Sequence, residues 1–235
     1  MLNAIGLQNP GIDVFIERDI PYLKQYDTNI IVNVCGKTPD EYIDVVRRLA
    51  EEDVALLEIN ISCPNVKAGG IAFGQDPKQV EKITAQIKAV AKQPVIMKLS
   101  PNVTDITEMA KAAEAGGADA ISFINTLTGM KIDINRRTFA LANKTGGMSG
   151  PAVKPVAVRM VYQAAHAVTI PVLGMGGIRT AEDALEFIMA GATMVAVGTA
   201  NFNEPATTVQ VIEGIEQFMQ QNGVKDINEL IGCVK

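Results

Sequence analysis

The sequence predicts an α/β protein built on a parallel sheet. Short apolar runs alternate along the chain with segments that carry helix start signals. The runs are continuously apolar, as expected for strands that are covered on both faces. Strands joined by helical crossovers lie parallel, and a closed (β/α) barrel is the leading arrangement. A doubly wound open sheet is the alternative, but no G-x-G-x-x-G motif follows the first strand to support a dinucleotide-binding fold.

Six apolar segments are predicted to be strands, about two fewer than a closed barrel needs. They span residues 29–35, 56–62, 94–99, 120–125, 171–175 and 194–197. The opening residues 3–11 and the polar, glycine-rich segment 126–150 are predicted to be loops.

Helix start signals follow these strands. Thr38, Pro39 and Glu41 combine an N-cap, a proline at the first helical position and a glutamate three residues after the cap. Helices are predicted over residues 39–52, 77–92, 105–116, 152–168, 181–191, 206–221 and 226–231.

The composition is that of an ordinary globular protein, with 48% hydrophobic and 20% charged residues among 235. The net charge of −5 and the absence of a basic cluster argue against a nucleic-acid surface. No apolar run reaches bilayer length and the start resembles no signal peptide. The odd number of cysteines fits free thiols in a reducing compartment best, so we expect a cytoplasmic protein. The three cysteines lack metal-site spacing, and the single histidine, His166, falls in a predicted helix. Serine–histidine and metal chemistry are therefore disfavoured.

Polar residues gather where the predicted strands end. In a parallel α/β barrel the carboxyl ends of the strands meet on one side, and the loops there carry function. Residues 60–65 (NISCPN) place two amides and a thiol at one such end. Taken alone, this stretch could be a turn around a buried cysteine. The other strand ends carry Asn33 and Cys35, Lys98 and Ser100, Asn125 and Thr126, Gly174 to Gly177, and Gly198 with Thr199.

Two of these strand ends predict a phosphate site. Gly176-Gly177 and Gly198-Thr199 follow the last two strands, where barrel enzymes commonly bind the phosphate of a cofactor. Glycine allows backbone N–H groups to approach an anion closely. Each pair alone would usually be a tight turn, but the two together indicate phosphate binding.

Lys98 interrupts an otherwise apolar strand, which costs free energy unless the ammonium meets an anion or an electron-rich group. It could extend to solvent at the sheet end. We favour a cation beside a cofactor ring that becomes anionic on reduction. Four asparagines at the same end suit a flat, neutral ring with C=O and N–H groups. They are Asn33, Asn60, Asn65 and Asn125. With no histidine at these ends, Cys63 is the candidate for proton transfer.

Together these residues make the chain similar to the class 1 dihydroorotate dehydrogenases. It is most similar to the catalytic subunit of the 1B type, which works with an electron-transfer partner. The resemblance spans essentially the whole chain, and related flavin barrels share the glycines but lack the cysteine loop combined with the Asn3 stretch. The motifs are residues 3–7 (NAIGL), 60–65 (NISCPN), 98–102 (KLSPN), 124–126 (INT), 146–151 (GGMSGP), 174–178 (GMGGI) and 198–199 (GT).

The resemblance implies one FMN-binding TIM-barrel domain over residues 1–235 that oxidises (S)-dihydroorotate to orotate in de novo pyrimidine (UMP) biosynthesis. Cys63 would be the general base that removes a proton from C5, while C6 gives a hydride to flavin N5. A thiol suits this task only when its pKa lies near ambient pH. Lys98 would stabilise the charge that develops on the reduced flavin.

The resemblance also implies two sets of binding residues and a partner. Electrons would pass to a subunit with FAD and [2Fe-2S] and on to NAD. The assembly would be a homodimer or a heterotetramer with that subunit. The alternative is a 1A enzyme, which uses fumarate as its electron acceptor. The substrate site would comprise Asn3, Ala4, Ile5, Gly6, Leu7, Asn60, Asn65, Asn125 and Thr126. The FMN site would comprise Asn33, Asn60, Lys98, Ile124, Gly150, Gly176, Gly177, Gly198 and Thr199, of which the last four would hold the phosphate. The segment 126–150 would include a loop beside the pocket.

The start of the chain departs from the family pattern. Family members begin with two further strands and a helix, and the second strand supplies a lysine that touches both flavin and substrate. We therefore expect a (β/α)8 TIM barrel that is truncated at the N-terminus, with about six of its eight strands. Its sheet would have two unpaired edges, so the chain alone is expected to fold poorly or to bind FMN weakly.

Three other functions compete with this one. A non-catalytic remnant would keep the partner-binding surface without turnover. Another flavin barrel, such as a domain like that of dihydropyrimidine dehydrogenase, would reduce a different pyrimidine, while the acidic charge balance argues against a tRNA dihydrouridine synthase. A phosphate-binding barrel without flavin would explain the glycines but not Cys63, Lys98 and the asparagines.

Overall fold

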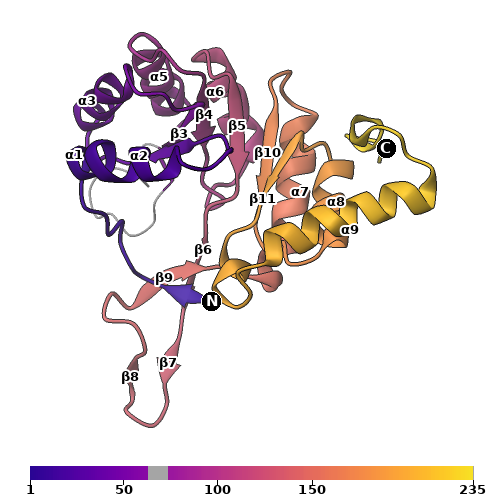
Figure 1. The fold of residues 1–235 in the computed structure, drawn as a ribbon. Coiled ribbons are helices and arrows are strands. Elements are labelled where there is room, and N and C mark those ends of the chain that lie inside the picture. The colour runs from indigo at the N-terminus through magenta and orange to yellow at the C-terminus, as the bar shows by residue number, and fades with distance from the viewer. Residues whose placement is uncertain (63–73, 235) are drawn as a thin grey trace.

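The structure is a computed structural model that describes residues 1–62 and 74–234, and its main feature is a curled parallel sheet (Figure 1). The six strands are ordered β11-β10-β5-β4-β3-β2, and all neighbouring pairs run parallel. The six predicted strands and the (β/α)-barrel class are thereby confirmed. The strands are β2 (Ile31–Val34), β3 (Leu56–Asn60), β4 (Val95–Lys98), β5 (Ala120–Phe123), β10 (Val172–Met175) and β11 (Met194–Ala196).

The main helices pack against one another in chain order, as in the outer ring of a barrel. The helices with a predicted N-cap begin where that signal placed them: the Thr38 hydroxyl accepts from the Glu41 N–H, and Thr180 and Asp183 form a capping box. Several end a few residues earlier than predicted. The helices are α3 (Pro39–Leu49), α5 (Pro77–Lys88), α6 (Ile106–Ala115), α7 (Lys154–Ala165), α8 (Ala181–Met189) and α9 (Thr207–Asn222). The predicted last helix is a 3-10 turn over Ile227–Leu230.

A helical run near the start of the chain was missed by the sequence analysis. It consists of α1 (Ile12–Val14), a π-helical turn (Phe15–Asp19) and α2 (Ile20–Leu23). The run begins after Gly11 without a side-chain cap, so the usual start signal is missing.

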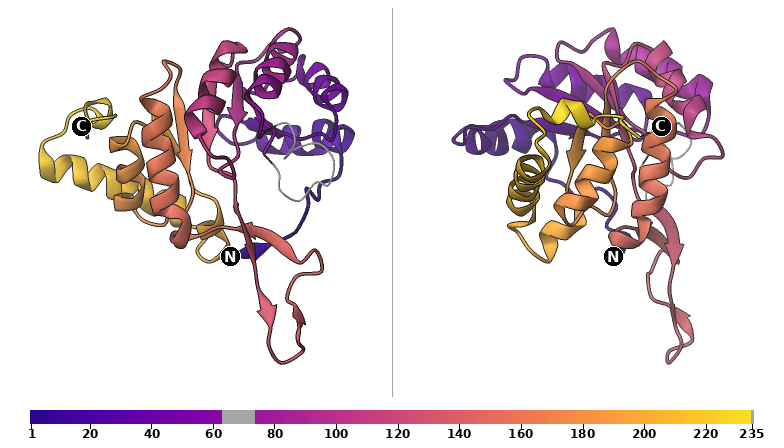
Figure 2. Two further views of the ribbon diagram at one scale, coloured as in Figure 1. Left: turned by 180° about the vertical axis from the view of Figure 1, so that it is seen from behind. Right: turned by 90° about the vertical axis from the view of Figure 1, so that its right-hand side faces the viewer.

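The loop predictions for residues 3–11 and 126–150 were partly wrong. Strand β1 (Leu2–Asn3) and strand β6 (Leu127–Met130) pair on either side of β9 (Thr145–Met148) in an antiparallel sheet. The sequence shows no apolar run here, because β9 contains glycines that let the neighbouring backbone approach closely. A Cβ on Gly146 would lie 2.4 Å from the Asn3 carbonyl oxygen. Between β6 and β9, a hairpin of β7 (Ile132–Asp133) and β8 (Thr138–Phe139) projects from the body of the molecule (Figures 1 and 2).

The two faces of the parallel sheet differ in chemistry. Alternate residues of β3, such as Leu57 and Ile59, are fully buried in the hydrophobic core, and Glu58 and Asn60 point to the opposite face. The described part of the sheet has β2 and β11 as its edge strands, where Ile31 and Met194 are 38% and 46% exposed.

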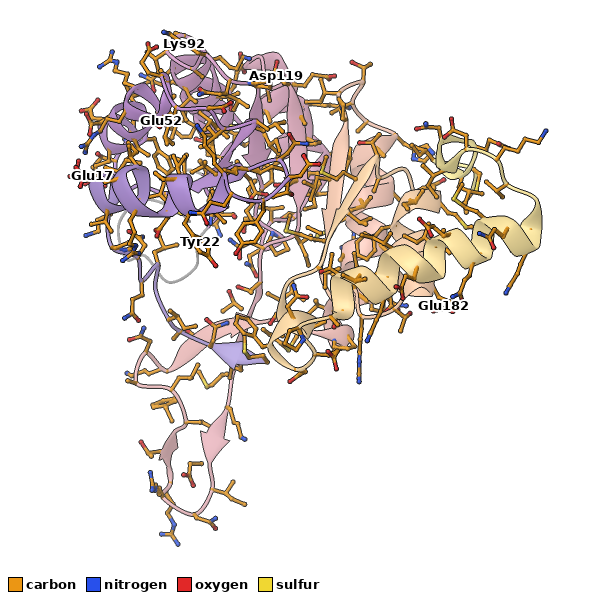
Figure 3. The ribbon with its side chains drawn as sticks, viewed as in Figure 1. Glu17, Tyr22, Glu52, Lys92, Asp119 and Glu182 are labelled. Atoms are coloured by element: carbon orange, nitrogen blue, oxygen red, sulfur yellow. The ribbon has the colours of Figure 1, made fainter. Side chains whose placement is uncertain are left out.

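The two ends of the sheet also differ. Lys92 and Asp119 precede β4 and β5 and lie at the end of the sheet away from the small antiparallel sheet (Figure 3). The carboxyl ends of the strands therefore face the antiparallel sheet. No helix among the described residues is long and apolar enough to cross a membrane.

Candidate functional site

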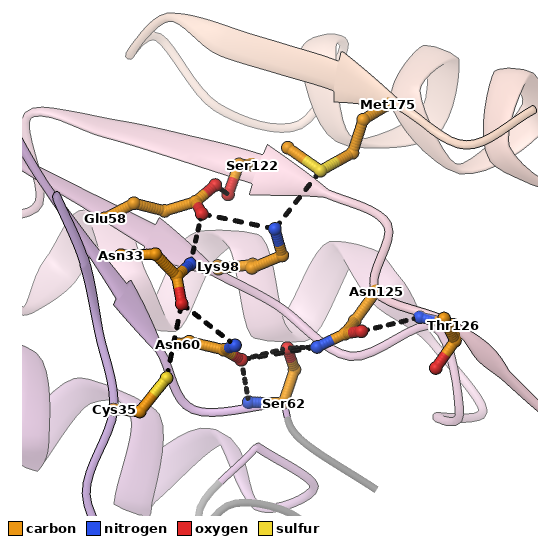
Figure 4. A network of polar contacts seen from close by, with 10 residues as sticks. All are labelled: Asn33, Cys35, Glu58, Asn60, Ser62, Lys98, Ser122, Asn125, Thr126 and Met175. Atoms are coloured by element: carbon orange, nitrogen blue, oxygen red, sulfur yellow. Dashed lines mark hydrogen bonds and ion pairs between the residues drawn. The ribbon is translucent and has the colours of Figure 1, made fainter. Parts of the chain in front are cut away.

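Four adjacent strands contribute one polar cluster to the inner face of the sheet (Figure 4). Glu58 of β3 lies directly opposite Asn33 of β2, and Lys98 of β4 lies opposite Ser122 of β5. The Glu58 carboxylate accepts hydrogen bonds from the Asn33 amide, from Ser122 Oγ at 2.7 Å and from Lys98 Nζ at 3.1 Å. The strand register therefore assembles a paired charge inside an otherwise apolar sheet.

A second cluster forms around the Asn60 side chain, at the carboxyl end of β3. Its Oδ1 accepts from Ser62 Oγ at 3.0 Å and from Asn125 Nδ2 at 3.3 Å, and its Nδ2 donates to Asn33 Oδ1 at 3.3 Å. Tyr42 of α3 fixes the backbone by donating its hydroxyl to the Asn60 carbonyl oxygen at 2.7 Å. Three of the four predicted asparagines thus meet, as expected from their positions at strand ends.

A pocket opens beside these clusters, and residues from several strand ends line it. The Lys98 ammonium reaches this pocket and contacts Met175 Sδ at 3.2 Å, and Asn125 accepts from the Thr126 N–H at 2.7 Å. The pocket is lined by Lys98, Ile124, Asn125, Thr126, Met148, Ser149, Val153, Met175, Gly176, Gly177, Ala196, Val197, Gly198 and Thr199. It therefore joins the predicted ring-binding residues to the predicted phosphate-binding residues.

The glycine end of the pocket continues into a small cavity that shares Gly177, Gly198 and Thr199 with it. Gly177 has φ +86°, and a Cβ there would lie 2.8 Å from the Gly150 carbonyl oxygen and 3.0 Å from the Lys154 nitrogen. Only glycine fits this turn without strain. The Thr199 hydroxyl donates to Ser149 Oγ at 2.8 Å, which places two hydroxyls beside the exposed backbone. The cavity is lined by Gly150, Pro151, Gly177, Ile178, Arg179, Gly198, Thr199, Ala200 and Asn203.

Asp183 secures the turn that follows these glycines. Its carboxylate accepts from the N–H groups of Arg179 at 2.9 Å and Thr180 at 3.0 Å, and from Lys154 Nζ at 2.6 Å. Burial raises the pKa of Asp183, but these hydrogen bonds outweigh it and bring the pKa below the ordinary aspartate value.

Replacing Asp183 by asparagine is expected to lower the free energy of unfolding by about 1–3 kcal/mol at neutral pH, because a charged partner of Lys154 is lost. The lowered folded-state pKa means that the carboxylate stabilises the fold above the unfolded value of about 3.9 and loses this effect as the pH falls through the folded value. Urea unfolding at several pH values should thus show a difference between the two proteins that shrinks below about pH 4. An equal difference at every pH would contradict the lowered pKa of Asp183 in the folded protein. The control is Glu213→Gln, which removes the charge of an exposed glutamate.

Several predicted residues lie apart from the pocket or outside the described structure. Asn3 pairs with Gly147 of β9, the strand whose Met148 lines the pocket, but none of residues 3–7 is among the lining residues. Cys63 and Asn65 lie outside the described residues. Cys35 donates its thiol to Asn33 Oδ1 at 3.2 Å. His166 is an exposed residue at the C-terminal end of α7, where its ring stacks on that of Tyr162 with a centroid separation of 4.1 Å.

The sequence analysis missed Glu58, Ser122 and Arg179. Glu58 carried the same signal as Lys98, a charge within an apolar strand, and pairing the two would have found it. The side chain of Lys98 is only 14% exposed, so the alternative of an ammonium that extends to solvent is wrong. Its position beside a flavin stays a prediction.

Comparisons with known proteins agree with this arrangement. Residues 1–219 match the family model described as dihydroorotate dehydrogenase. The chain is 75% identical over 235 residues to the protein of Lachnoclostridium phytofermentans named dihydroorotate dehydrogenase B (NAD(+)), catalytic subunit, and it covers 78% of that protein. It is 63% identical over 234 residues to a protein of the same name from Alkaliphilus metalliredigens, of which it also covers 78%.

A solved structure shares the fold of this chain. The crystal structure of the dihydroorotate dehydrogenase of Eimeria tenella, in complex with ferulenol, superposes with a TM-score of 0.81. The match covers 99% of this chain and 70% of that one at 22% identity, a level that supports the fold alone.

Proposed function

Because the chain belongs to the dihydroorotate dehydrogenase family, whose enzymes oxidise dihydroorotate in pyrimidine biosynthesis, we propose that it forms one FMN-binding domain that converts (S)-dihydroorotate to orotate. Cys63 acts as the base, and electrons pass to a partner subunit and NAD. The observation that carries the proposal is that Lys98, Asn125 and both glycine strand ends line one pocket.

The residues of the pocket fit FMN. The phosphate would be bound by backbone N–H groups at Gly177 and Gly198 and by the hydroxyls of Ser149 and Thr199. A Cβ at position 177 would overlap the Gly150 carbonyl oxygen, so this close turn requires glycine. Lys98 would offer its ammonium to the ring system, with Ile124 as an apolar wall. Asn33 is not among the residues that line this pocket, and its amide donates to Glu58 behind Lys98. When bound, FMN supplies the hydride acceptor for C6 of dihydroorotate.

The asparagine cluster suits the pyrimidine. Asn60 and Asn125 are tied together, and their orientation is set by Ser62 and by the backbone N–H of Thr126, so their remaining donors and acceptors are held in fixed directions. A ring with alternating C=O and N–H groups matches such amides. Asn65 and residues 3–7 complete the proposed substrate site from the loops on either side.

Cys63 follows this cluster directly in the chain, since it comes three residues after Asn60. We assign it the removal of the C5 proton. If this step preceded hydride loss from C6, negative charge would build up at C5; if the two occur together, the electron pair forms the C5–C6 double bond. A thiol is basic enough for this step near neutral pH once its pKa is lowered into that range.

The electron partner is proposed from the relatives, which are named as catalytic subunits of NAD(+)-type enzymes. We infer that this chain acts in the cytoplasm with a second subunit that carries FAD and [2Fe-2S]. The catalytic chain would form a homodimer, or a heterotetramer together with that subunit. Co-purification of the two chains, with NAD reduction on addition of dihydroorotate, tests this part of the proposal. NAD reduction that needs no partner would contradict it.

Turnover with an artificial electron acceptor tests the substrate. With FMN present in excess, we expect dihydroorotate to reduce the acceptor and dihydrouracil, which lacks the carboxylate, to be a poor substrate. A preference for dihydrouracil would favour the dihydropyrimidine dehydrogenase-like alternative instead. Partner binding without turnover would favour the non-catalytic remnant.

A further inference from the structure

Glu58 is a buried carboxylate that the proposed chemistry does not use. Its side chain is 10% exposed and lies in the middle of β3, between apolar residues. Both of its oxygens are hydrogen-bonded, Oε1 to Ser122 and Oε2 to Lys98 and Asn33. A buried charge costs free energy unless it is paired in this way, and strands β2, β4 and β5 supply the donors.

The carboxylate stands behind the Lys98 ammonium as seen from the pocket. Lys98 lines the pocket and Glu58 does not, although the two groups are 3.1 Å apart. A lysine side chain has four flexible methylenes and no preferred direction of its own. The hydrogen bond to Glu58, together with the contact to Met175 Sδ at 3.2 Å, decides where its charge lies.

We propose that Glu58 is a positioning residue that holds the Lys98 ammonium at the pocket wall and offsets part of its charge. The inference rests on the proposed function, in which Lys98 adjoins the flavin ring. An uncompensated ammonium there would stabilise the reduced, anionic flavin more strongly. Glu58 thus sets how easily the bound flavin is reduced, and how readily it passes electrons on.

The midpoint potential of the FMN-loaded chain tests this role. Glu58→Gln keeps the shape of the side chain and removes its charge, so we expect a shift toward reduced flavin of about tenfold in the equilibrium, or about 30 mV for a two-electron couple. Glu213→Gln, an exposed glutamate on α9, should leave the potential unchanged. An unchanged or lowered potential in Glu58→Gln would overturn the proposal, since a merely structural glutamate would alter stability alone.

A double-mutant cycle in the flavin-free chain tests the pairing by itself. We expect Glu58→Gln and Lys98→Met each to raise the unfolding equilibrium constant, and the double variant to be at least about fivefold more stable than the two effects combined predict. Additive effects would contradict the pairing. Should Glu58→Gln fail to fold, restored folding in the double variant supports the pairing, and a double variant that stays unfolded contradicts it.

The two measurements also separate this inference from the proposed function. A wild-type chain that binds no FMN contradicts the proposed function, while the cycle still decides whether Glu58 holds Lys98. A chain that binds FMN with a potential insensitive to Glu58 leaves the proposed function standing and removes the inference.

Discussion

Replacement of Cys63 by alanine is expected to lower kcat for dihydroorotate by about 10²–10⁴-fold, the usual contribution of a positioned general base. FMN binding should stay intact, because Cys63 is not among the proposed flavin contacts. Cys63→Ser should retain part of the activity at high pH, since a hydroxyl is a far weaker base than a thiolate at neutral pH. The pH dependence of kcat in the three proteins is the measurement.

The control for this experiment is Cys233→Ala. Cys233 is an exposed cysteine near the C-terminus, far along the chain from the strand ends, and its loss should not change kcat. If Cys63→Ala retained activity within about threefold of the wild type, another group would have to be the base.

Replacing Gly177 by alanine is expected to weaken FMN binding by about 10²-fold and to lower the free energy of unfolding by about 2–5 kcal/mol. The backbone at φ +86° disfavours a side chain by about 1–2 kcal/mol, and the new Cβ would overlap the Gly150 carbonyl oxygen at a further cost of about 1–3 kcal/mol. Relief of this overlap must open the turn at Gly177, which lines the small cavity beside Gly150. Titration of FMN and urea unfolding of the same samples measure both effects.

Gly223→Ala is the matched control. Gly223 also has a positive φ, of 67°, at the end of α9, but a Cβ there would meet nothing within 4 Å. This variant should show the backbone strain alone, about 1–2 kcal/mol, with FMN affinity unchanged. Equal FMN affinities in the two variants would contradict the placing of the phosphate beside Gly177.

The parts of the fold that the sequence predicted are those with strong local signals. The continuous apolar runs marked all six strands of the parallel sheet, and capping residues such as Thr38 and Thr180 marked the helix starts. Parallel order then places the strand ends together, which is why Asn60 and Asn125 could be expected to meet.

The parts that were missed depend on contacts between distant residues. Strand β1 has two residues and is held by β9, whose glycines show no strand pattern but allow the backbone of Asn3 to approach. The partner of Lys98 was also missed, because a single charge in a strand shows that a partner is needed without showing which one. Strand register, set by the packing of the whole sheet, decides that Glu58 supplies it.

The visible spectrum of the chain with bound FMN, recorded before and after anaerobic addition of dihydroorotate, tests the proposed function most directly. We expect the oxidised flavin band to bleach on addition of dihydroorotate and to return when an electron acceptor is added. A chain whose bound FMN is bleached by a chemical reductant but not by dihydroorotate would contradict the proposed function.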